Sequence, residues 1–587
     1  MAIPGTGPRI MNEKSEFKDV IVVGAGIGGL CAAKTYLELS PGTNITVLES
    51  RTTLGGVWAE QNLYEGLCTN NLYSTYEYSD FPMFAEKYGL KKDMHISGEV
   101  MYRYLTDYAN HFDIFQRINF STKVLEVEKL EDGWKITTTS TSDDSKKGVL
   151  YTRKLIMCNG LASNPNPITI PGHETFDKPI FNHGGLKDKA EALARDPNVK
   201  HVTVIGASKI GYDAVWLFAH YGKKVDWIIR KSGGGAVWMS KPYVKIGPWN
   251  LMLEHVVCMR FFTWFSPCIW GSYDGFGWIR RFLNKTRIGR WLMDGMWENT
   301  RNGTIEVAGY RREERLKHLE PSESLFWTAR VGIHNYPTDV HDFVRSGQVT
   351  IKHIDVNSLS SGGTVNFADG TSQRTDVLVQ ITGWQLIPTI KWKPEGIDAS
   401  VGVPSQSYSR GELDFWSDLD KRADSQILHQ FPRLADPPKN KLPYTQPVTP
   451  FRLYRGIAPP GLTAHGDRSL AFVKMVHCTS DIILAETQSL WLYAYMNNKL
   501  NIDERDVYWQ TALSSRFGAW RYPWGFSKWW PEFVYDAIPY ADMLLTDLGL
   551  RKHRKSSWLK ERFEGYTIHD YKGINDEWRA KYGKIKR

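Results

Sequence analysis

The stretch VIVVGAGIGGLCAA, residues 20–33, joins two apolar runs through Gly24, Gly26 and Gly29. Glycines in this G-x-G-x-x-G spacing permit a tight turn and bring backbone N–H groups at a helix start close to a pyrophosphate. The next apolar run, NITVLES, ends in Glu49, twenty residues after Gly29. A carboxylate at that place can bind a ribose hydroxyl. A strand, glycine turn, helix, strand and acid in this order predict a dinucleotide-binding unit.

A second copy of this arrangement begins at VIGASKIGYDA, residues 204–214. Gly206 and Gly211 bracket its turn, and Ser208, whose hydroxyl can bond a phosphate, replaces the middle glycine. Its second strand ends in Arg230 and Lys231 instead of an acid. An acid suits a free ribose 2′-OH, whereas a cation suits a 2′-phosphate. We therefore predict FAD in the first unit and NADPH in the second; a solvated loop start is the alternative for the two cations.

Two dinucleotides in one chain imply hydride transfer from a nicotinamide to a flavin. The six cysteines are scattered, and none forms a C-x-x-C or metal-like pair. This spacing predicts reduced thiols in a cytoplasmic protein, with no metal site. Without a dithiol to receive the electrons, oxygen is the expected acceptor.

Two further apolar runs suggest where the chain leaves and re-enters the first unit. One ends at Asn159 and Gly160, and the other ends at Thr382 and Gly383, which we expect to contact cofactor. The predicted fold is α/β, with two Rossmann-like, three-layer domains built on parallel sheets and the NADPH domain inserted in a discontinuous FAD domain. The expected divisions are a disordered leader 1–17, FAD domain parts 18–170 and 376–500, NADPH domain 171–375 with a helical, aromatic-rich insertion 235–325, and an aromatic and basic C-terminal extension 501–587.

Several motifs in addition to the glycine turns resemble the flavin-containing monooxygenase superfamily, and most closely its fungal-type members. They are LGGVW at 54–58, CTNNLYSTYEYSDFPM at 68–83, HISGEVMYRYLTDYANHF at 95–112, VGIHNYPTDVHDFVRSGQV at 331–349, VLVQITGW at 377–384 and AETQSLWLYAYM at 485–496. This superfamily includes N,N-dimethylaniline monooxygenases and Baeyer–Villiger monooxygenases.

The resemblance implies a mechanism and further site residues. NADPH reduces FAD, the reduced flavin captures O2 as a C4a-(hydro)peroxide, and one oxygen atom passes to an apolar small organic substrate, by N/S-oxygenation or hydroxylation and in a secondary-metabolic setting. Asn70 falls on the family's active-site asparagine beside the flavin, and Gly56, Val57 and Trp58 fall on a cofactor-binding segment. Exclusion of water is then the protein's main task.

The family's Baeyer–Villiger fingerprint, F-x-G-x-x-x-H followed by an aromatic residue, is degraded in this chain. In FDKPIFNHGGL, Phe176 and His183 lie one residue too far apart, and Lys178 stands where glycine is expected. N- or S-oxygenation is therefore favoured. Baeyer–Villiger oxidation of a ketone, an NADPH-dependent flavin oxidoreductase or oxidase without oxygen insertion, and a nucleotide-binding scaffold remain as alternatives.

The insertion and the tail raise the question of a membrane. The apolar run 256–270 is interrupted by Arg260 and is shorter than the ~20 residues that span a bilayer. Core packing, a pocket lid and peripheral membrane contact through 256–282 stay open, since tryptophans with Arg280 and Arg281 suit an interface. The tail after residue 550 alternates basic and acidic residues, so we expect a solvated surface and no nucleic-acid partner. The sequence does not indicate an oligomeric state.

Overall fold

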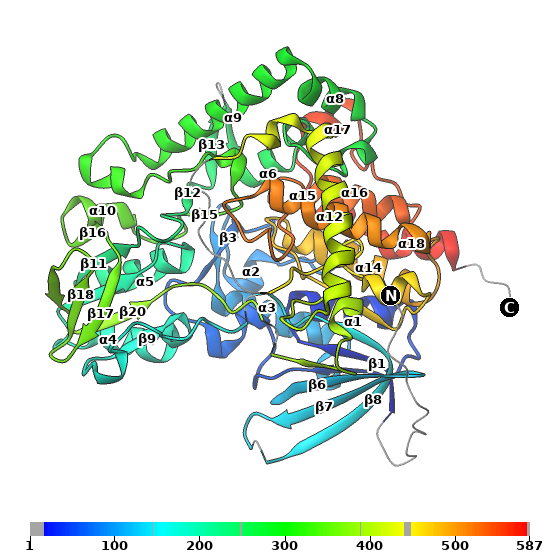
Figure 1. Ribbon diagram of the computed structural model, residues 1–587, viewed down its shortest axis with the longest axis horizontal. Coiled ribbons are helices and arrows are strands. Elements are labelled where there is room, and N and C mark those ends of the chain that lie inside the picture. The colour runs from blue at the N-terminus through cyan, green and yellow to red at the C-terminus, as the bar shows by residue number, and fades with distance from the viewer. Residues whose placement is uncertain are drawn as a thin grey trace.

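The computed structural model describes residues 17–143, 145–161, 163–246, 249–387, 389–438 and 448–583. The leader expected over 1–17 lies outside these ranges except for Phe17, the first residue of strand β1. Figure 1 shows two sheets side by side below a helical region that caps the molecule.

The first sheet contains the first glycine turn. Its strand order is β21-β6-β7-β8-β1-β2-β5, and β22 pairs with β8. β1 is parallel to both β2 and β8, and its residues Val20–Val23 are buried, which explains the unbroken apolar run. The strands are β1 (Phe17–Val23), β2 (Ile45–Leu48), β5 (Ile118–Asn119), β6 (Thr122–Leu130), β7 (Gly133–Ser140), β8 (Lys147–Met157), β21 (Lys391–Lys393) and β22 (Leu470–Phe472). Helices α1 (Ile27–Leu39) and α14 (Asp481–Met496) pack together beside this sheet.

The second sheet contains the second glycine turn and is parallel throughout. Its order is β16-β11-β10-β20-β9, and helix α5 (Lys209–His220) connects β10 to β11. The strands are β9 (Ile180–Asn182), β10 (His201–Ile205), β11 (Lys224–Ile229), β16 (Val349–His353) and β20 (Val377–Gln380). Helix α10 (Val340–Arg345) lies beside α5, and a three-stranded antiparallel sheet packs its apolar side chains against the other face: β17 (Val356–Ser360), β18 (Thr364–Phe367) and β19 (Ser372–Arg374). The predicted α/β class is confirmed. The second sheet is parallel, as predicted, whereas the first is mixed, because β7 pairs antiparallel with both β6 and β8.

One predicted boundary is wrong for a single strand. We expected residues from 376 onward to belong to the first unit, but β20 pairs with β10 and β9 in the second sheet. The chain joins the first sheet again only at β21. A buried apolar strand carries no mark of which parallel sheet it enters, so the sequence pattern could not decide this. The other domain limits stay predictions.

The insertion at 235–325 forms the cap at the top of Figure 1. It contains strands β12 (Trp238–Ser240), β13 (Tyr243–Ile246) and β14 (Trp249–Met252) and helices α6 (Leu253–Val257), α7 (Arg260–Trp264), α8 (Gly277–Lys285) and α9 (Arg287–Ala308). β12 pairs with β15 (Val331–Ile333), which closes the insertion. Within the run 256–270, Phe262, Trp264, Cys268 and Trp270 are buried, so this part packs as core.

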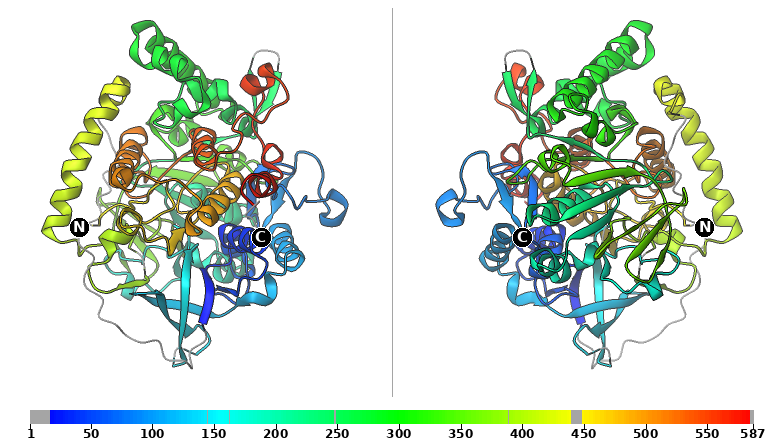
Figure 2. Two further views of the ribbon diagram at one scale, coloured as in Figure 1. Left: turned by 90° about the vertical axis from the view of Figure 1, so that its right-hand side faces the viewer. Right: turned by 90° about the vertical axis from the view of Figure 1, so that its left-hand side faces the viewer.

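Helices dominate the remaining chain. The elements are β3 (Cys68–Leu72), α2 (Ala85–Tyr88), β4 (His95–Ser97), α3 (Gly98–His111), α4 (Glu191–Arg195), α11 (Asp398–Val401), α12 (Arg410–Gln430), α13 (Pro460–Ala464), α15 (Val507–Arg521), α16 (Ala537–Asp547), α17 (Trp558–Phe563) and α18 (Ile574–Tyr582). The long α12 runs along one flank (Figure 2). In the C-terminal extension, Trp524, Trp529 and Trp530 are buried, which agrees with core packing.

Candidate active site

The first glycine turn is compact because each glycine meets backbone. Gly24 has a φ of +104°, and a Cβ there would lie 2.5 Å from the carbonyl oxygen of Cys158. A Cβ on Gly29 would lie 1.9 Å from the carbonyl oxygen of Gly24. Gly26 is the N-cap of α1, and a Cβ added to it would lie 3.5 Å from the Cα of Gly56. The turn therefore leaves the N-terminus of α1 open for close approach by a phosphate.

Glu49 lies beside this turn at the end of β2. Its carboxylate is only 4% exposed and accepts hydrogen bonds from the backbone N–H groups of Ala25 (2.8 Å) and Arg51 (2.9 Å). These bonds fix both oxygens next to the glycine turn and leave lone pairs for ribose hydroxyls. The geometry fits the predicted FAD-binding role.

The LGGVW segment approaches the same turn. Gly56 has a φ of +64°, and a Cβ there would lie 3.1 Å from the Cα of Gly26. Val57 is 59% exposed, whereas the Trp58 ring is buried and makes a T-shaped contact with the Tyr76 ring. Gly56 therefore lies next to the first glycine turn, with Val57 exposed and Trp58 buried, and their contact with a cofactor stays a prediction.

The second turn repeats this geometry. A Cβ on Gly206 would lie 2.0 Å from the carbonyl oxygen of Ile381, and one on Gly211 would lie 2.4 Å from that of Gly206. Ser208 caps α5 through its backbone, and its hydroxyl makes no capping bond. Arg230 is exposed directly after β11, with Lys231 next to it. Among the described residues neither cation forms an ion pair, so both remain available to a 2′-phosphate.

The structure brings Thr382 and Gly383 to the second sheet instead of the first. They follow β20, one residue beyond the Ile381 carbonyl that abuts the second turn. Asn166 bonds both of them, with its side-chain N–H donating to the Thr382 oxygen (3.0 Å) and its backbone N–H to the Gly383 oxygen (3.0 Å). These two residues therefore form part of the crossing between the sheets, and their contact with a cofactor stays a prediction.

Asn70 lies on strand β3, which is fixed by hydrogen bonds from other segments of the chain. The Asn335 amide donates to the backbone oxygens of Cys68 (2.9 Å) and Thr69 (3.1 Å), and the Thr69 hydroxyl accepts from the N–H of Ile96 (3.0 Å). Thr69 is buried and Asn70 is exposed, as expected for successive residues of a strand. The Asn70 amide is thus presented outward from a fixed backbone.

A buried polar cluster, which the sequence did not predict, joins the two units. Asp213 on α5 accepts from the hydroxyls of Tyr64 (2.8 Å) and Tyr336 (2.7 Å) and pairs with Lys209. The Lys209 ammonium also lies 4.5 Å from the centre of the Tyr336 ring. Tyr64 precedes β3, so this cluster fixes the Asn70 strand relative to the second glycine turn. The sequence feature that could have indicated this cluster is the pair Lys209 and Asp213, four residues apart and directly after Ser208.

A second set of missed residues lies after β22, beside the first turn. A Cβ on Gly28 would lie 3.0 Å from the Cγ of Lys474, whose ammonium pairs with Asp481 at the start of α14. His477 binds Glu532 of the C-terminal extension, with 3.2 Å between Nδ1 and Oε1. The His477 side chain is 50% exposed, yet chain surrounds it closely enough to remove much of its hydration. The Glu532 bond therefore joins the segment after β22 to the C-terminal extension.

We expect His477 to titrate above its ordinary pKa of 6.5. Burial lowers the pKa of His477, but the hydrogen bond and charge of Glu532 raise it by more. Because the folded-state pKa is raised, this pair stabilises the fold fully below pH 6.5, and that contribution is lost as pH rises through the folded-state pKa. Histidine NMR titration of the holoenzyme checks this.

Glu532→Gln removes the negative charge but keeps a side-chain oxygen. That oxygen can still accept the hydrogen bond that the Ser527 hydroxyl donates to Glu532 at 2.8 Å. The His477 pKa should then fall below its wild-type value. The exposed Glu395→Gln is the matched control and should leave it unchanged. An equal His477 pKa in wild type and Glu532→Gln would show that the dyad does not set this titration.

The insertion also reaches this region through Glu254. It lines a water-sized cavity of about 10 Å³, accepts a hydrogen bond from the Thr75 hydroxyl (2.7 Å), and has its pKa raised to about 7 by burial. Asn71, the neighbour of Asn70, and Asp481 also line this cavity. Elements β3, α6 and α14 therefore each contribute a polar side chain to the lining of this cavity.

The residues of the degraded fingerprint are engaged in packing. His183 is buried with its ring centre 4.0 Å from that of Trp384, and burial lowers its pKa to about 4. Phe176 is 8% exposed in the core of the second unit. His183 is thus a neutral packing residue at the crossing between the sheets.

These features define an α/β protein with two glycine turns of the dinucleotide-binding type. A family model, flavin-binding monooxygenase-like, matches residues 17–269. The FAD-dependent monooxygenase DEP4 of Alternaria brassicicola is 32% identical over 96% of this chain and 94% of its own length. The FAD-dependent monooxygenase resA of Aspergillus sclerotiorum is 31% identical over 96% and 98%. The chain belongs to this family and is a FAD-dependent monooxygenase.

Solved structures agree on the fold. The open crystal structure of cyclohexanone monooxygenase matches with a TM-score of 0.58 at 16% identity, covering 92% of this chain and 99% of its own. The complex of OTEMO with FAD and NADP matches with a TM-score of 0.53 at 17% identity, covering 83% and 84%. FAD and NADPH are the cofactors of the family. Within the described residues no helix is long and apolar enough to cross a bilayer.

Proposed function

We propose that this chain is an NADPH- and O2-dependent monooxygenase that transfers one oxygen atom to an apolar small organic molecule. The observation that carries the proposal is the pair of unlike glycine turns. Glu49 lies beside one and Arg230 with Lys231 follows the strand after the other, and the Asp213 cluster joins Tyr64, which precedes the Asn70 strand, to the second turn. When bound, FAD supplies the hydride acceptor and the oxygen-reactive ring.

The residues of the chain bind, orient and exclude water. Glu49 and the N-terminus of α1 hold the flavin dinucleotide, and Arg230 selects the 2′-phosphate of NADPH. Asn70 donates an amide N–H to the oxygen that is to be transferred. The C-terminal extension packs its tryptophans behind the segment that carries His477, which keeps bulk water from the site.

Oxygenation of a soft nitrogen or sulfur, or hydroxylation, suits this site better than ketone oxidation. His183 and Phe176 are used for packing. Ketone oxidation also needs an arginine free to stabilise a peroxy anion. Arg330 cannot serve, since its guanidinium donates to the backbone oxygens of Gly234 and Gly235 and pairs with Glu323. Baeyer–Villiger oxidation and an oxidase without oxygen insertion are the competing activities.

Asn70→Ala tests the oxygen-transfer role. The variant should bind FAD and consume NADPH, but it should release hydrogen peroxide at least about tenfold faster than wild type when no organic substrate is present. A hydrogen bond to a developing charge contributes about 1.5–3 kcal/mol, and 1.4 kcal/mol is a factor of ten. Peroxide formation per NADPH, measured with full FAD occupancy, checks this.

Asn110→Ala, at an exposed position on α3, is the matched control and should behave as wild type. Equal peroxide release from Asn70→Ala and wild type would remove Asn70 from the proposed role. Wild-type enzyme that converts all NADPH to peroxide, even with amines, sulfides or ketones present, would assign the chain to the oxidases instead.

A further inference from the structure

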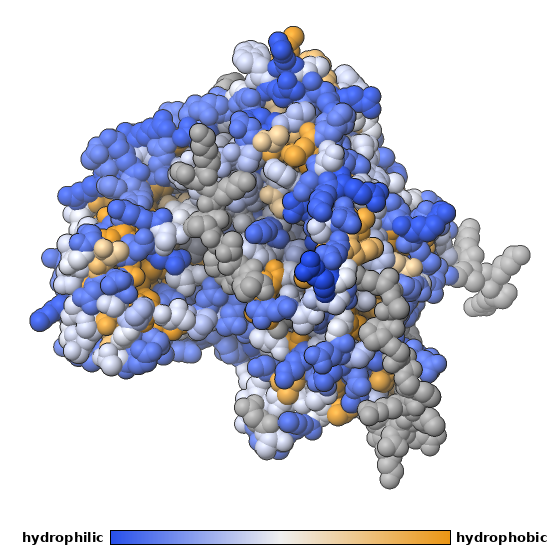
Figure 3. Space-filling view, viewed as in Figure 1, coloured by the Kyte–Doolittle hydropathy of each residue, from blue (hydrophilic) through white to orange (hydrophobic). Residues whose placement is uncertain are grey.

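The tip of the insertion exposes apolar side chains that a folded surface ordinarily hides. Trp278 is 71% exposed and Phe282 42% on α8, and Ile288 is 66% and Trp291 72% exposed on α9. We call these four residues and Leu292 (40% exposed) the apolar ridge. In Figure 3 the tip at the top of the view shows hydrophobic side chains among hydrophilic ones.

The ridge belongs to a well-packed helical pair. Leu283, Met293 and Trp297, on the opposite faces of α8 and α9, are buried. A Cβ on Gly289 would lie 2.2 Å from the carbonyl oxygen of Phe282, so the two helices touch closely. The exposed residues 278 and 282, and 288, 291 and 292, follow helical spacing along one face of each helix. Their exposure is a property of the native packing.

Helix α17 of the C-terminal extension adds a second exposed group beside α8. Trp558 is 65% exposed, Leu559 53% and Phe563 49%. The Arg562 guanidinium lies 4.8 Å from the centre of the Phe276 ring, directly before α8, and 4.7 Å from that of Trp558. Arg562 therefore places the exposed group of α17 next to the segment that leads into α8.

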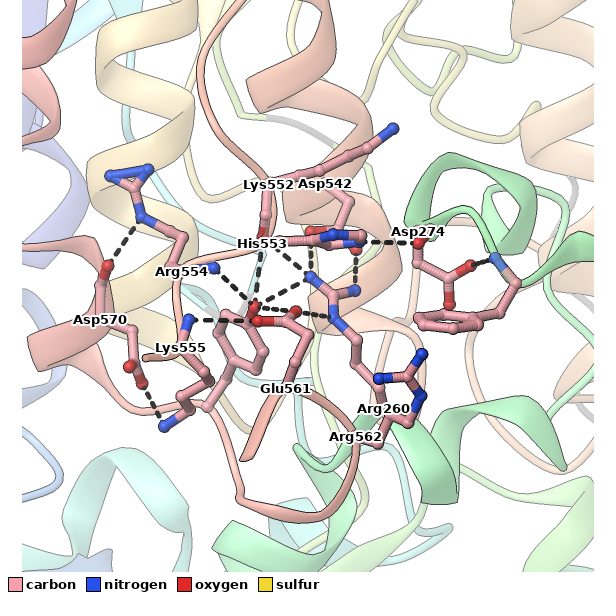
Figure 4. A network of polar contacts seen from close by, with 12 residues as sticks. Arg260, Asp274, Asp542, Lys552, His553, Arg554, Lys555, Glu561, Arg562 and Asp570 are labelled. Carbon is pink, nitrogen blue, oxygen red and sulfur yellow. Dashed lines mark hydrogen bonds and ion pairs between the residues drawn. The ribbon is translucent and has the colours of Figure 1, made fainter. Parts of the chain in front are cut away.

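A buried ionic network fixes α17 to the insertion (Figure 4). The Arg260 guanidinium on α7 is inaccessible to solvent and pairs with Asp542 of α16 and with Glu561 of α17. It also donates to the backbone oxygen of Lys552 (2.9 Å) and to the Tyr566 hydroxyl (3.1 Å). Breaking such a network leaves a buried charge, so the two exposed groups are held in one rigid arrangement.

The surroundings of this surface are strongly basic. Residues 277–293 contain five Lys or Arg and no Asp or Glu, and residues 551–563 contain six Lys or Arg and one acid, Glu561, which is buried. Arg281, Lys285 and Arg287 are exposed beside the ridge. Two copies of this chain would bring like charges together at this face, which disfavours self-association.

We propose that α8, the start of α9 and α17 form a docking surface for an anionic lipid membrane. Exposed Trp, Phe, Ile and Leu side chains suit the boundary between headgroups and acyl chains, and lysines and arginines around them suit anionic headgroups. A nucleic acid would use the cations but gives Ile288 and Leu292 nothing apolar to contact. The membrane-facing side chains are thus the apolar ridge with Trp558, Leu559 and Phe563. Helix α7, in the largely buried run 256–270, packs against both α8 and α17.

Vesicle sedimentation of the FAD-loaded enzyme tests the surface. Wild type should sediment with vesicles of phosphatidylcholine mixed with phosphatidylserine at least about tenfold more strongly than with phosphatidylcholine alone, and salt should weaken the binding. Trp278→Ala with Trp291→Ala should remove most binding to both vesicles. Arg281→Gln with Arg287→Gln should remove the preference for phosphatidylserine.

Phe84→Ala with Phe115→Ala is the matched control, since these rings are 60% and 38% exposed on elements of the first unit. It should sediment as wild type, and all variants should keep FAD and the wild-type circular dichroism spectrum. Equal sedimentation of the Trp278/Trp291 variant and wild type, or no sedimentation of wild type, would overturn the proposal. Salt-sensitive binding to duplex DNA that survives loss of both tryptophans would overturn it in favour of a nucleic-acid surface.

Discussion

Gly26→Ala is expected to abolish FAD retention while the apoprotein remains folded. Gly26 has a φ of −81°, which any residue adopts, and an added Cβ would meet only backbone atoms of Gly56, the Cα at 3.5 Å and the N at 3.8 Å. The methyl group would, however, occupy the space through which a pyrophosphate approaches the start of α1. Losing two charge-assisted hydrogen bonds at about 1.5–3 kcal/mol each weakens FAD binding by roughly a hundredfold or more.

The FAD-to-protein absorbance ratio after gel filtration measures retention, and FAD titration of the apoprotein measures the Kd. Gly42→Ala is the matched control, because nothing lies within 4 Å of its added Cβ. It should retain full FAD. The apoproteins of both variants should have the same thermal unfolding midpoint as the wild-type apoprotein. Stoichiometric FAD in Gly26→Ala would show that the first turn is not the pyrophosphate site.

Arg230→Ala should lower the kcat/KM for NADPH by about ten- to a hundredfold and leave that for NADH nearly unchanged. The Arg230 side chain is exposed at the end of β11 and can bind a 2′-phosphate, which NADH lacks. One charge-assisted contact contributes about 1.5–3 kcal/mol, which sets this range. The loss should appear in KM more than in kcat, because the contact is remote from the reacting ring.

Anaerobic stopped-flow reduction of the bound flavin by each nucleotide measures this selectivity. Lys224→Ala is the matched control, since Lys224 is an exposed cation at the opposite end of the same strand. It should keep the wild-type preference. An equal loss with NADPH and NADH in Arg230→Ala would show that Arg230 acts on the fold instead of on the 2′-phosphate.

The sequence predicted the two glycine turns and Glu49 because short-range spacing determines them. The steric need for Gly29 arises from the Gly24 carbonyl within the turn, so the pattern and the geometry coincide there, whereas Gly24 is required by the distant Cys158 carbonyl. The sheet of β20 was not predictable, since its pairing with β10 joins residues far apart in the chain. The same holds for the His477–Glu532 pair, which spans 55 residues and follows no local rule.

The insertion and the tail likewise depend on contacts between distant residues, which the sequence pattern does not predict. Helical spacing groups Trp278 with Phe282, but only their exposure in the folded protein shows that this face is outward. We expected the tail after residue 550 to be a solvated surface, and this is wrong in part. Lys555 is almost fully buried and pairs with Asp570, because the tail folds back around the Arg260 network. Charge counts do not reveal such internal partners.

The central claim is that the two dinucleotide sites cooperate to transfer an oxygen atom. The most direct measurement is rapid mixing of the NADPH-reduced enzyme with oxygenated buffer, without organic substrate, followed by absorbance. We predict a long-lived spectrum distinct from both oxidised and reduced flavin, with slow release of peroxide. Immediate return to oxidised flavin with one equivalent of peroxide, unchanged by added NADP+ and by amines, sulfides or ketones, would contradict it.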